Sequence, residues 1–364
     1  MRNNLLDDII KCDIEISNPA SNDISFGMIL LILEKASATG KKPLSDEVIE
    51  IAKADELLDY GYKATDSAYI ATSVCFSQKP SPNRVYACVR KKPDTAYEDL
   101  KATLDRANSQ VGFYGFHITG FKDKADVVKA ADWAEANHKL FGFEYDNIAN
   151  MPLTKTDYYR TFALYSGTAD GFEAGNQPKE NAFAALALMA KCFSYEPGTE
   201  TWHLKVLNRI YPSLLSSDQK KSLEGRNIGT ILRYAGTNCS VGGAVISGEW
   251  IDIIRFVDWL KNEMQNNLFR LFIDNKKIPY NDSGINLILC KIEETLKKAQ
   301  DIGGISLNEF DEDGNEIPGY SIKVPNSAQL TEETRKSRKL TGCTWSARVA
   351  GAIHAVEIQG TITF

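Results

Sequence analysis

Few side chains in this sequence have the type and spacing that metal binding or catalysis needs. The histidines are His117, His138, His203 and His354. No spacing between these residues and Cys or Asp suits zinc, so we expect each histidine to have a structural role. The acidic stretch 311–316, DEDGNE, resembles a calcium loop but lacks the spaced ligands and terminal glutamate of an EF-hand. We interpret it as a polar turn and predict no metal site.

The glycine-rich segment 236–243, GTNCSVGG, is the other candidate for chemistry. It contains neither the Gly-Lys-Ser/Thr of a phosphate loop nor a G-x-G-x-x-G pattern. We interpret it as a loop that precedes a long helix. No G-x-S-x-G occurs, and the Ser, His and acidic residues are not arranged to suggest a nucleophile. The sequence therefore predicts no catalytic residue and no cofactor, which argues against an enzyme.

A charged pair and two tryptophans lie in or beside a predicted helix near residue 255. Arg255 and Asp258 are three residues apart, which suits a local surface ion pair worth about 0.3–0.5 kcal/mol. The alternative is that these two charges contact a neighbouring subunit, and both interpretations stay open. Trp250 and Trp259 are predicted to anchor a core, because large aromatic side chains contribute most when buried.

Composition and charge argue against several classes of protein. The 364 residues provide room for two or three domains. A net charge of −6 disfavours direct binding to nucleic acid or to an anionic membrane. No window of about 20 apolar residues occurs, so we expect no membrane insertion. The acidic start, MRNNLLDDIIKC, does not resemble a secretory signal. Seven cysteines without a C-x-x-C pair indicate small core residues in a reducing cytosol.

Apolar runs and turn residues in the first half of the chain predict strands and helices in turn. The expected strands are 26–33, 84–90, 112–118, 140–145 and 161–165. The expected helices are 45–58, 65–78, 97–107 and 124–138. This alternation is typical of an α/β layer. The turn-rich segment 167–178 is interpreted as a domain boundary.

Long helices are expected in the second half of the chain. The predicted elements are a buried helix over 181–193, strands around Leu204 and Leu232, a capped helix over 217–223, a hairpin-like turn over 310–318 and a strand over 320–324. The apolar stripe of a further, amphipathic helix consists of Trp250, Ile254, Val257, Leu260, Met264, Leu268 and Leu271. Pro279 ends this helical pattern, and 282–284 is expected to cap a partner helix over 285–299.

The last residues of the chain alternate strictly between apolar and polar side chains. The apolar positions are Val356, Ile358, Gly360, Ile362 and Phe364. From Trp345 to Ala355 the alternation has the opposite phase, and a one-residue shift turns every later side chain to the other face of a sheet. One interpretation is a β-bulge within one sheet. The other is that the chain leaves its own sheet and adds a strand to a neighbour.

The segment 248–284 contains a distinctive series of motifs. It opens with G-E-W-I-D and closes with K-I-P-Y-x-D-x-G from Lys277 to Gly284. Between them lies an R-x-x-D-W-L core made of Arg255, Asp258, Trp259 and Leu260. A second signal is F-S-Q-x-P-x-P over 76–82. On these motifs the chain resembles the sheath proteins of contractile tails, which encase the tube of myovirus tails and related phage-like particles.

This resemblance implies a mixed α/β fold, a discontinuous multi-domain sheath protomer with extended N- and C-terminal β-arms. The parts that it implies are an N-terminal arm over 1–20, a core-domain strand over 21–35, an α/β middle region over 36–95, an outer α/β domain over 96–175, a C-terminal core sheath domain over 176–350 and a C-terminal β-arm over 351–364. It also implies that the arms complete sheets in adjacent subunits. The predicted arm residues are Ile14, Ile16, Val356, Ile358, Ile362 and Phe364.

The resemblance also implies a structural role in place of a catalytic one. Subunits are expected to polymerise as helically stacked hexameric rings around a tail tube and to contract, driving the tube through the host envelope. The implied partners are further copies, the tube protein, and baseplate and tail terminator proteins. The implied location is the virion tail, after assembly in the host bacterial cytoplasm. The alternatives are another tail part (a tube or baseplate protein) and an α/β enzyme with a nucleotide or sugar site in the 95–165 layer.

Overall fold

The computed structural model describes residues 25–42, 47–93, 96–120, 123–148, 151–153, 157–173 and 176–360. The chain divides into two compact units, which are described separately. Among the described residues, the larger unit consists of those up to Glu196 and of Glu200–Asp252, and the smaller unit of Pro197–Thr199 and those from Ile253 onward. Four predicted arm residues lie outside the described residues: Ile14, Ile16, Ile362 and Phe364.

The larger unit contains a mixed sheet that is parallel in its centre. Its eight described strands follow the order β2-β3-β1-β4-β5-β6-β7-β8. Their bounds are β1 Ile29–Leu33, β2 Ile49–Ile51, β3 Val85–Val89, β4 Gly115–Ile118, β5 Leu140–Tyr145, β6 Thr161–Tyr165, β7 Gly229–Tyr234 and β8 Thr237–Val241. Only the edge strands β2 and β8 pair antiparallel. The run ILLIL of β1 is buried throughout, as expected for a strand with both faces covered.

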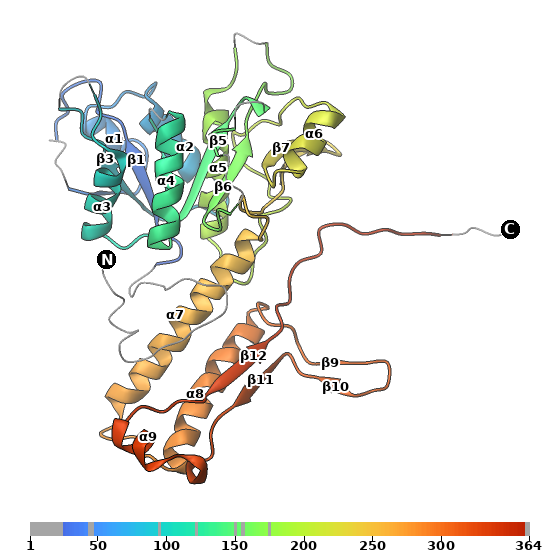
Figure 1. Ribbon diagram of the computed structural model, residues 1–364. Coiled ribbons are helices and arrows are strands. Elements are labelled where there is room, and N and C mark those ends of the chain that lie inside the picture. The colour runs from blue at the N-terminus through green and yellow to red at the C-terminus, as the bar shows by residue number, and fades with distance from the viewer. Residues whose placement is uncertain are drawn as a thin grey trace. The chain divides into compact units, whose positions relative to one another are not determined.

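Helices cover both faces of this sheet (Figure 1). They are α1 Glu56–Asp59, α2 Ser67–Phe76, α3 Leu100–Gln110, α4 Lys124–Asn137, the 3-10 helix η2 Lys179–Phe183, α5 Ala184–Phe193 and α6 Ser217–Glu224. Successive residues of β4 point to opposite faces. A Cβ on Gly115 would lie 2.7 Å from the ring of Phe193 in α5. Its neighbour Phe116 packs edge-on against Trp133 of α4, with ring centroids 5.5 Å apart. Hence α4 and α5 lie on opposite faces.

The smaller unit is built from long helices and short β-ribbons. Its elements are α7 Ile251–Asp274 (in this unit from Ile253), α8 Asp282–Asp301, β9 Glu309–Phe310, β10 Glu316–Ile317, β11 Tyr320–Lys323, the 3-10 helix η3 Ser327–Gln329, α9 Glu332–Ser337 and β12 Thr344–Ala347. Strands β9 and β10 form one two-stranded ribbon, and β11 and β12 form another, which packs against α8. The predicted mixed α/β class is thus confirmed.

Several predicted elements differ from the structure. The helix expected over 45–58 is wrong, because Ile49–Ile51 is strand β2 and only Glu56–Asp59 is helical. The β-branched residues Val48, Ile49 and Ile51 favour a strand over a helix. The strand expected around Leu204 reduces to a bridge between Val206 and Cys239.

The glycine-rich segment 236–243 was wrongly assigned to a loop. Thr237–Val241 is strand β8, which pairs with β7 through a two-residue turn. Both turn residues, Ala235 and Gly236, have positive φ angles, 46° and 81°. A pair of positive φ angles is typical of the hairpin turns that match strand twist.

The two compact units of the chain do not divide at the predicted boundary 167–178. Strands β6 and β7 lie on either side of that segment, and they pair in parallel with Leu164 opposite Gly229. One sheet therefore continues across the segment. The structure does not separate an outer domain over 96–175 from a core domain over 176–350; its division falls at Asp252–Ile253.

Candidate assembly site

The helix pair α7–α8 forms the framework of the smaller unit. Lys298 of α8 forms an ion pair with Glu263 of α7 at 2.8 Å, and its Nζ lies 5.2 Å from the ring centroid of Trp259. Asn267 Nδ2 donates to Thr295 Oγ1 at 3.0 Å between the same helices. Trp259 is 5 % exposed, in agreement with the predicted core anchor, whereas Trp250 is 40 % exposed and is not one.

Two glycines, Gly198 and Gly304, lie so close to the ring of Phe256 that no larger residue fits at either position. A Cβ on Gly304 would lie 2.1 Å from Phe256 Cε2, and a Cβ on Gly198 would lie 2.8 Å from Phe256 Cδ2. Real Cβ atoms do not approach so closely, so a larger residue at either position would displace the ring or the backbone. Gly198 also has a φ of +93°, which favours glycine independently.

The motif Lys277–Gly284 forms the turn between α7 and α8. The N-cap of α8 is Asn281, whose side chain accepts from Gly284 N at 3.1 Å. The cap was predicted at 282–284 and the helix from Ile285, so the helix begins three residues earlier than expected, at Asp282. A Cβ on Gly284 would lie 1.8 Å from Pro279 O, which explains the glycine physically. The close approach of Gly284 to Pro279 O therefore helps to define the turn, beside the conformational restriction by the proline.

The same turn holds the segment that contains α9. Tyr280 Oη donates to Lys339 O at 2.8 Å. Arg335 donates to Tyr280 O at 2.8 Å and to Ser327 O at 2.5 Å. The Asp282 carboxylate accepts from Ser327 N at 2.9 Å, and hydrogen bonding by Ser327 lowers the pKa of this carboxyl. The motif recognised in the sequence therefore fixes a junction between α7, α8 and α9.

The β11–β12 ribbon has one apolar face and two open edges. Tyr320 pairs with Ala347 and Ile322 with Trp345, and these four side chains are half-buried on the face toward α8. The intervening residues Ser321, Lys323, Thr344 and Ser346 are exposed. Among the described residues no third strand pairs with either strand. Each open edge presents unpaired backbone groups that can accept another strand.

The chain beyond β12 leaves this ribbon. Ala350 N donates to Gly304 O at 3.1 Å, and Ile305 bridges Val349. Residues 351–360 then form no strand, and Figure 1 shows them extending away from β12. The bulge interpretation is therefore wrong for the isolated chain, because neither side of Ala355–Val356 belongs to a sheet. Val356 and Ile358 are 73 % and 86 % exposed.

Arg255 and Asp258 are not surface residues. Their exposed fractions are 0 % and 6 %, so the predicted surface ion pair is wrong. The same helix buries Asp252, Lys261 and Gln265, which a simple apolar-stripe analysis assigns to solvent. Burying charges requires compensating polar neighbours. A subunit contact through Arg255 and Asp258 remains a prediction, and it would require this part of the chain to open.

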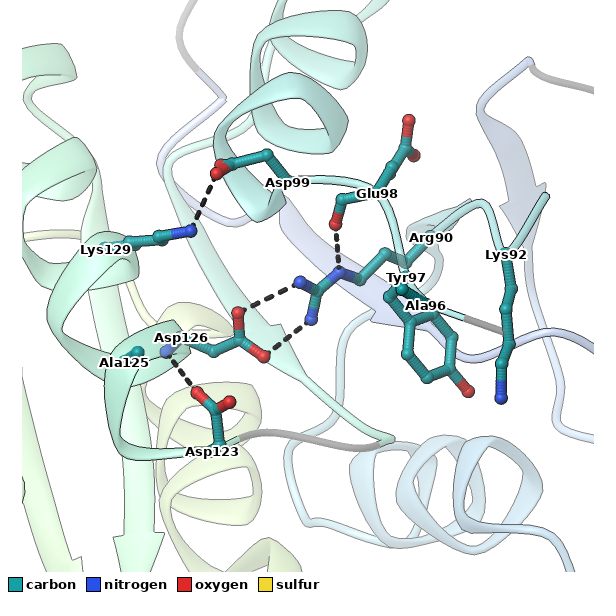
Figure 2. A pocket seen from close by; sticks show the side chains of 10 residues that line it. All are labelled: Arg90, Lys92, Ala96, Tyr97, Glu98, Asp99, Asp123, Ala125, Asp126 and Lys129. Atoms are coloured by element: carbon teal, nitrogen blue, oxygen red, sulfur yellow. Dashed lines mark hydrogen bonds and ion pairs between the residues drawn. The ribbon is translucent and has the colours of Figure 1, made fainter. Parts of the chain in front are cut away.

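A cavity of about 560 Å³ lies in the larger unit, where a nucleotide or sugar site would be expected. Arg90 follows β3, and Asp123 and Asp126 open α4 after β4, so the cavity lies at the carboxyl ends of parallel strands. Figure 2 shows Arg90 and Asp126 facing each other across it. Two hydrogen bonds of 2.7 and 3.0 Å join these side chains, which are nearly buried.

The other acidic groups of this cavity are engaged in holding helices. Asp123 caps α4 through Asp126 N, and Asp99 caps α3 through Lys101 N. Lys129 bonds to Asp99 at 2.7 Å and, with the cap, lowers the pKa of that carboxyl. Glu98 accepts from Thr103 and Arg106. Such a network positions loops, and it offers neither a phosphate loop nor a pair of catalytic acids.

The histidines and cysteines show no metal site within the described part of the chain. No group of three or more His, Cys, Asp or Glu residues there could hold a metal ion. His117 is fully buried, and its Nε2 lies 2.8 Å from a Glu144 carboxylate oxygen. Glu144 also accepts from Ala185 N at 2.7 Å, at the N-terminus of α5. Through these hydrogen bonds His117 and Glu144 attach the N-terminus of α5 to the sheet.

One stretch of sequence matches a known family. Residues 251–362 match the C-terminal domain of the tail sheath protein gp31-like family of E217. No curated protein matches the chain. The described part of the chain has no helix long and apolar enough to cross a membrane.

Solved structures extend the likeness to the fold of nearly the whole chain. The helical sheath of the anti-feeding prophage, in its contracted state, matches with a TM-score of 0.66 and 13% identity, covering 97% of both chains. A chain of the anti-feeding prophage baseplate matches with 0.64 and 13%, covering 98% of both. A sheath tail protein of Listeria innocua matches with 0.53 and 12%, covering 82% of this chain and 88% of that one.

The resemblance predicted from the motifs is confirmed: residues 251–362 match a tail sheath family model, and the fold is similar to that of solved contractile sheath proteins. The region matched in sequence begins at α7 and contains the α7–α8 turn, the β11–β12 ribbon and most of the tail. The matching proteins belong to contractile sheaths and to a baseplate, which agrees with the expected structural role.

Proposed function

We propose that this chain is the structural subunit of a contractile tail sheath. The observation that carries the proposal is the combination of the sequence match over 251–362 with a sheath fold over 97% of the chain. Copies stack as hexameric rings around a tail tube in the host bacterial cytoplasm. The assembled sheath contracts and drives the tube through the host cell envelope. Its other partners are the baseplate and tail terminator proteins.

Terminal arms join the subunits of this sheath. Val356 and Ile358 expose large apolar side chains to solvent in the isolated chain, which favours a partner. Their period of two suits a strand that lies with one face against an apolar surface. The open edges of the β11–β12 ribbon in another copy supply the backbone partners, and an added strand extends the face on which Ile322 and Trp345 lie toward α8. Main-chain hydrogen bonds supply affinity and the alternate side chains supply register.

Strand exchange also suits a polymer that must change shape without coming apart. Contraction requires two packings of one protomer, and side-chain interfaces between subunits re-form during such a change. Main-chain pairing between an arm and a ribbon does not depend on those interfaces. The tail from Gly351 to Gly360, which makes no strand contact with its own ribbon, can serve as the tether.

Removing residues 356–364 tests the arm directly. The shortened protomer should fold with an unchanged circular dichroism spectrum and fail to form tubes, because its tethers are missing. Negative-stain microscopy of the purified full-length and shortened chains measures the outcome. Tubes of normal length from the shortened chain would contradict the arm assignment.

Two matched double variants distinguish strand pairing by the arm from nonspecific association of the tail. Val356→Asn with Ile358→Asn disrupts the apolar phase, whereas Glu357→Ala with Gln359→Ala alters only the polar phase. The first pair should abolish tubes and the second should retain them. Equal loss in both pairs would mean that alternation is unimportant.

A second position in the same particle is a baseplate subunit with a sheath-like fold. The match to a chain of the anti-feeding prophage baseplate favours this candidate. The microscopy separates the two positions: striated tubes from the purified chain support a sheath, and closed rings without tubes support a baseplate part.

A further inference from the structure

The β9–β10 hairpin, residues 307–318, projects from the smaller unit without covering its apolar side chains. Leu307, Phe310 and Ile317 are 68 %, 71 % and 38 % exposed. A two-stranded ribbon alone is marginally stable in water, and here only two residue pairs join the strands. The turn is held internally, since Asp311 accepts from Asn315 N at 2.8 Å. The hairpin is an ordered element with unoccupied apolar surface.

The hairpin is also uniformly acidic. It carries Glu309, Asp311, Glu312, Asp313 and Glu316 and no Lys or Arg. Glu309 is partly neutralised by Arg348 at 3.1 Å. Glu312 and Asp313, at the tip, are exposed. A partner for this surface must therefore combine apolar contacts with positive charge.

The other end of the smaller unit has the complementary character. Its exposed cations are Lys276, Lys277, Lys323, Arg335, Lys336, Arg338 and Lys339. They outnumber the neighbouring acids, which are Asp274, Asp282, Glu332 and Glu333. Exposed apolar side chains lie beside them: Phe272 and Ile273 in the last turn of α7, and Leu287 near the start of α8, are 42 %, 62 % and 39 % exposed. We call this surface the basic end.

Chain topology places the hairpin and the basic end at opposite ends of one ribbon. Strand β11 begins at Tyr320, directly after the hairpin, and ends at Lys323, from which the chain enters the α9 segment. Strand β12 returns antiparallel to the hairpin side. The hydrogen bond of Tyr280 to Lys339 O joins the α7–α8 turn to the α9 side. Figure 1 shows α9 and the β9–β10 hairpin at opposite ends of the β11–β12 ribbon.

We propose that the hairpin of one copy docks on the basic end of a second copy. Because the two complementary surfaces lie at opposite ends of one unit, they meet only between molecules. Such a head-to-tail contact is heterologous, and repeated without closure it generates a helical polymer. This inference rests on the proposed self-assembly, and it assigns to the lattice a contact distinct from strand exchange by the arms.

Two charge-reversal variants test this contact in the full-length chain. The acid-reversed variant is Glu312→Lys with Asp313→Lys, and the base-reversed variant is Lys276→Glu with Lys339→Glu. All four side chains are exposed, so thermal unfolding should be unchanged. Each variant alone should raise the protein concentration needed for sedimentable polymers by about tenfold, because attraction becomes repulsion at every junction.

Restoration identifies the contact as intermolecular. In a mixture of the two variants, alternating copies bring opposite charges together at every junction, so polymers should reappear near the wild-type concentration. A single chain with all four substitutions should also polymerise. For the wild type, raising the salt from 0.1 to 1 M should weaken polymers as the Debye length falls from about 10 to about 3 Å.

The outcomes separate this contact from the proposed function. Wild-type tubes together with single reversals that polymerise normally would overturn the contact and leave the sheath function intact. The same holds if neither the mixture nor the fourfold variant recovers. A wild type that forms no polymer removes both proposals. If a reversal variant misfolds, Glu312→Gln with Asp313→Asn takes its place, with an expected rise of about threefold.

Discussion

The two units of this protein differ in how much of their apolar surface and of their strand edges is covered within the chain. In the larger unit a sheet is covered on both faces, and the cluster around Phe116, Phe141 and Trp133 is almost fully buried. In the smaller unit a ribbon keeps open edges, a hairpin exposes Phe310, and the tail exposes Ile358. The first resembles a finished domain, and the second resembles a part that is completed by other copies. Assembly should therefore depend on residues that contribute little to the stability of the isolated chain.

The largest effect should come from emptying the closed core. Phe116 lies 4.9 Å from Phe141 and 5.5 Å from Trp133 between ring centroids, and it is fully buried. Phe116→Ala should lower the free energy of unfolding by about 3–5 kcal/mol, since it leaves a cavity. Chemical denaturation measures this loss. Phe310→Ala is the matched control and should change stability by less than about 0.5 kcal/mol. Similar losses in both would break the comparison between a closed and an open unit.

A smaller effect should come from the turn that organises the open unit. Gly284→Ala places a Cβ where Pro279 O already lies, so the turn must shift. The expected loss is about 1–3 kcal/mol, typical of overpacking. Hydrogen exchange should show faster opening of the α9 segment, which is held by Tyr280 and Asp282. Gly314→Ala, at a glycine with open space around it, is a control for a Cβ clash, though its φ of +82° adds some strain. Unchanged exchange in Gly284→Ala would mean that the motif does not hold that segment.

The last effect concerns pH and the closed unit, and solvent screening at the half-buried Glu135 keeps it below the full value of the pKa shift. Burial raises the pKa of Glu135 from 4.5 to about 7, although Arg160 N donates to this carboxyl. The folded state therefore binds a proton more tightly than the unfolded state. Stability should fall as the pH rises from about 4.5 to about 7 and level off above that range. Glu135→Gln should flatten this slope in thermal melts, and Glu333→Gln, at an exposed position, should leave it unchanged. If the stability of the wild type did not depend on pH between about 4.5 and about 7, the raised pKa of Glu135 would be contradicted.

Local signals predicted much of both units because they act over a few residues. The apolar run before Leu33, the helical pattern of α4, the cap of α6 and the long period of α7 all gave elements at the expected places. Strand β2 and strand β8 were missed because three to five residues carry weak propensity and are stabilised by neighbours distant in sequence. The boundary expected at 167–178 rests on local turn signals, which do not reveal the pairing of β6 with β7 across that segment.

The candidate assembly site, too, was predicted only in part from the sequence. The motif Lys277–Gly284 carried the resemblance to sheath proteins in the sequence. Its physical role depends on the approach of Gly284 to Pro279 O and on the hydrogen bond from Tyr280 to Lys339 O, which only the structure shows. Arg255 and Asp258 were placed on the surface by helical spacing, because spacing gives the face of a helix and not what covers it.

The sequence by itself indicated the likeness to sheath proteins, the class of fold and the alternation of the C-terminal residues, since each depends on residue type and short spacing. Tertiary structure decided where the units divide, which charges of α7 are buried, and that the β11–β12 ribbon and the β9–β10 hairpin are left open. Those features depend on contacts between segments far apart in the chain. Their free energies are set by burial and by pairing in three dimensions, which no local pattern encodes.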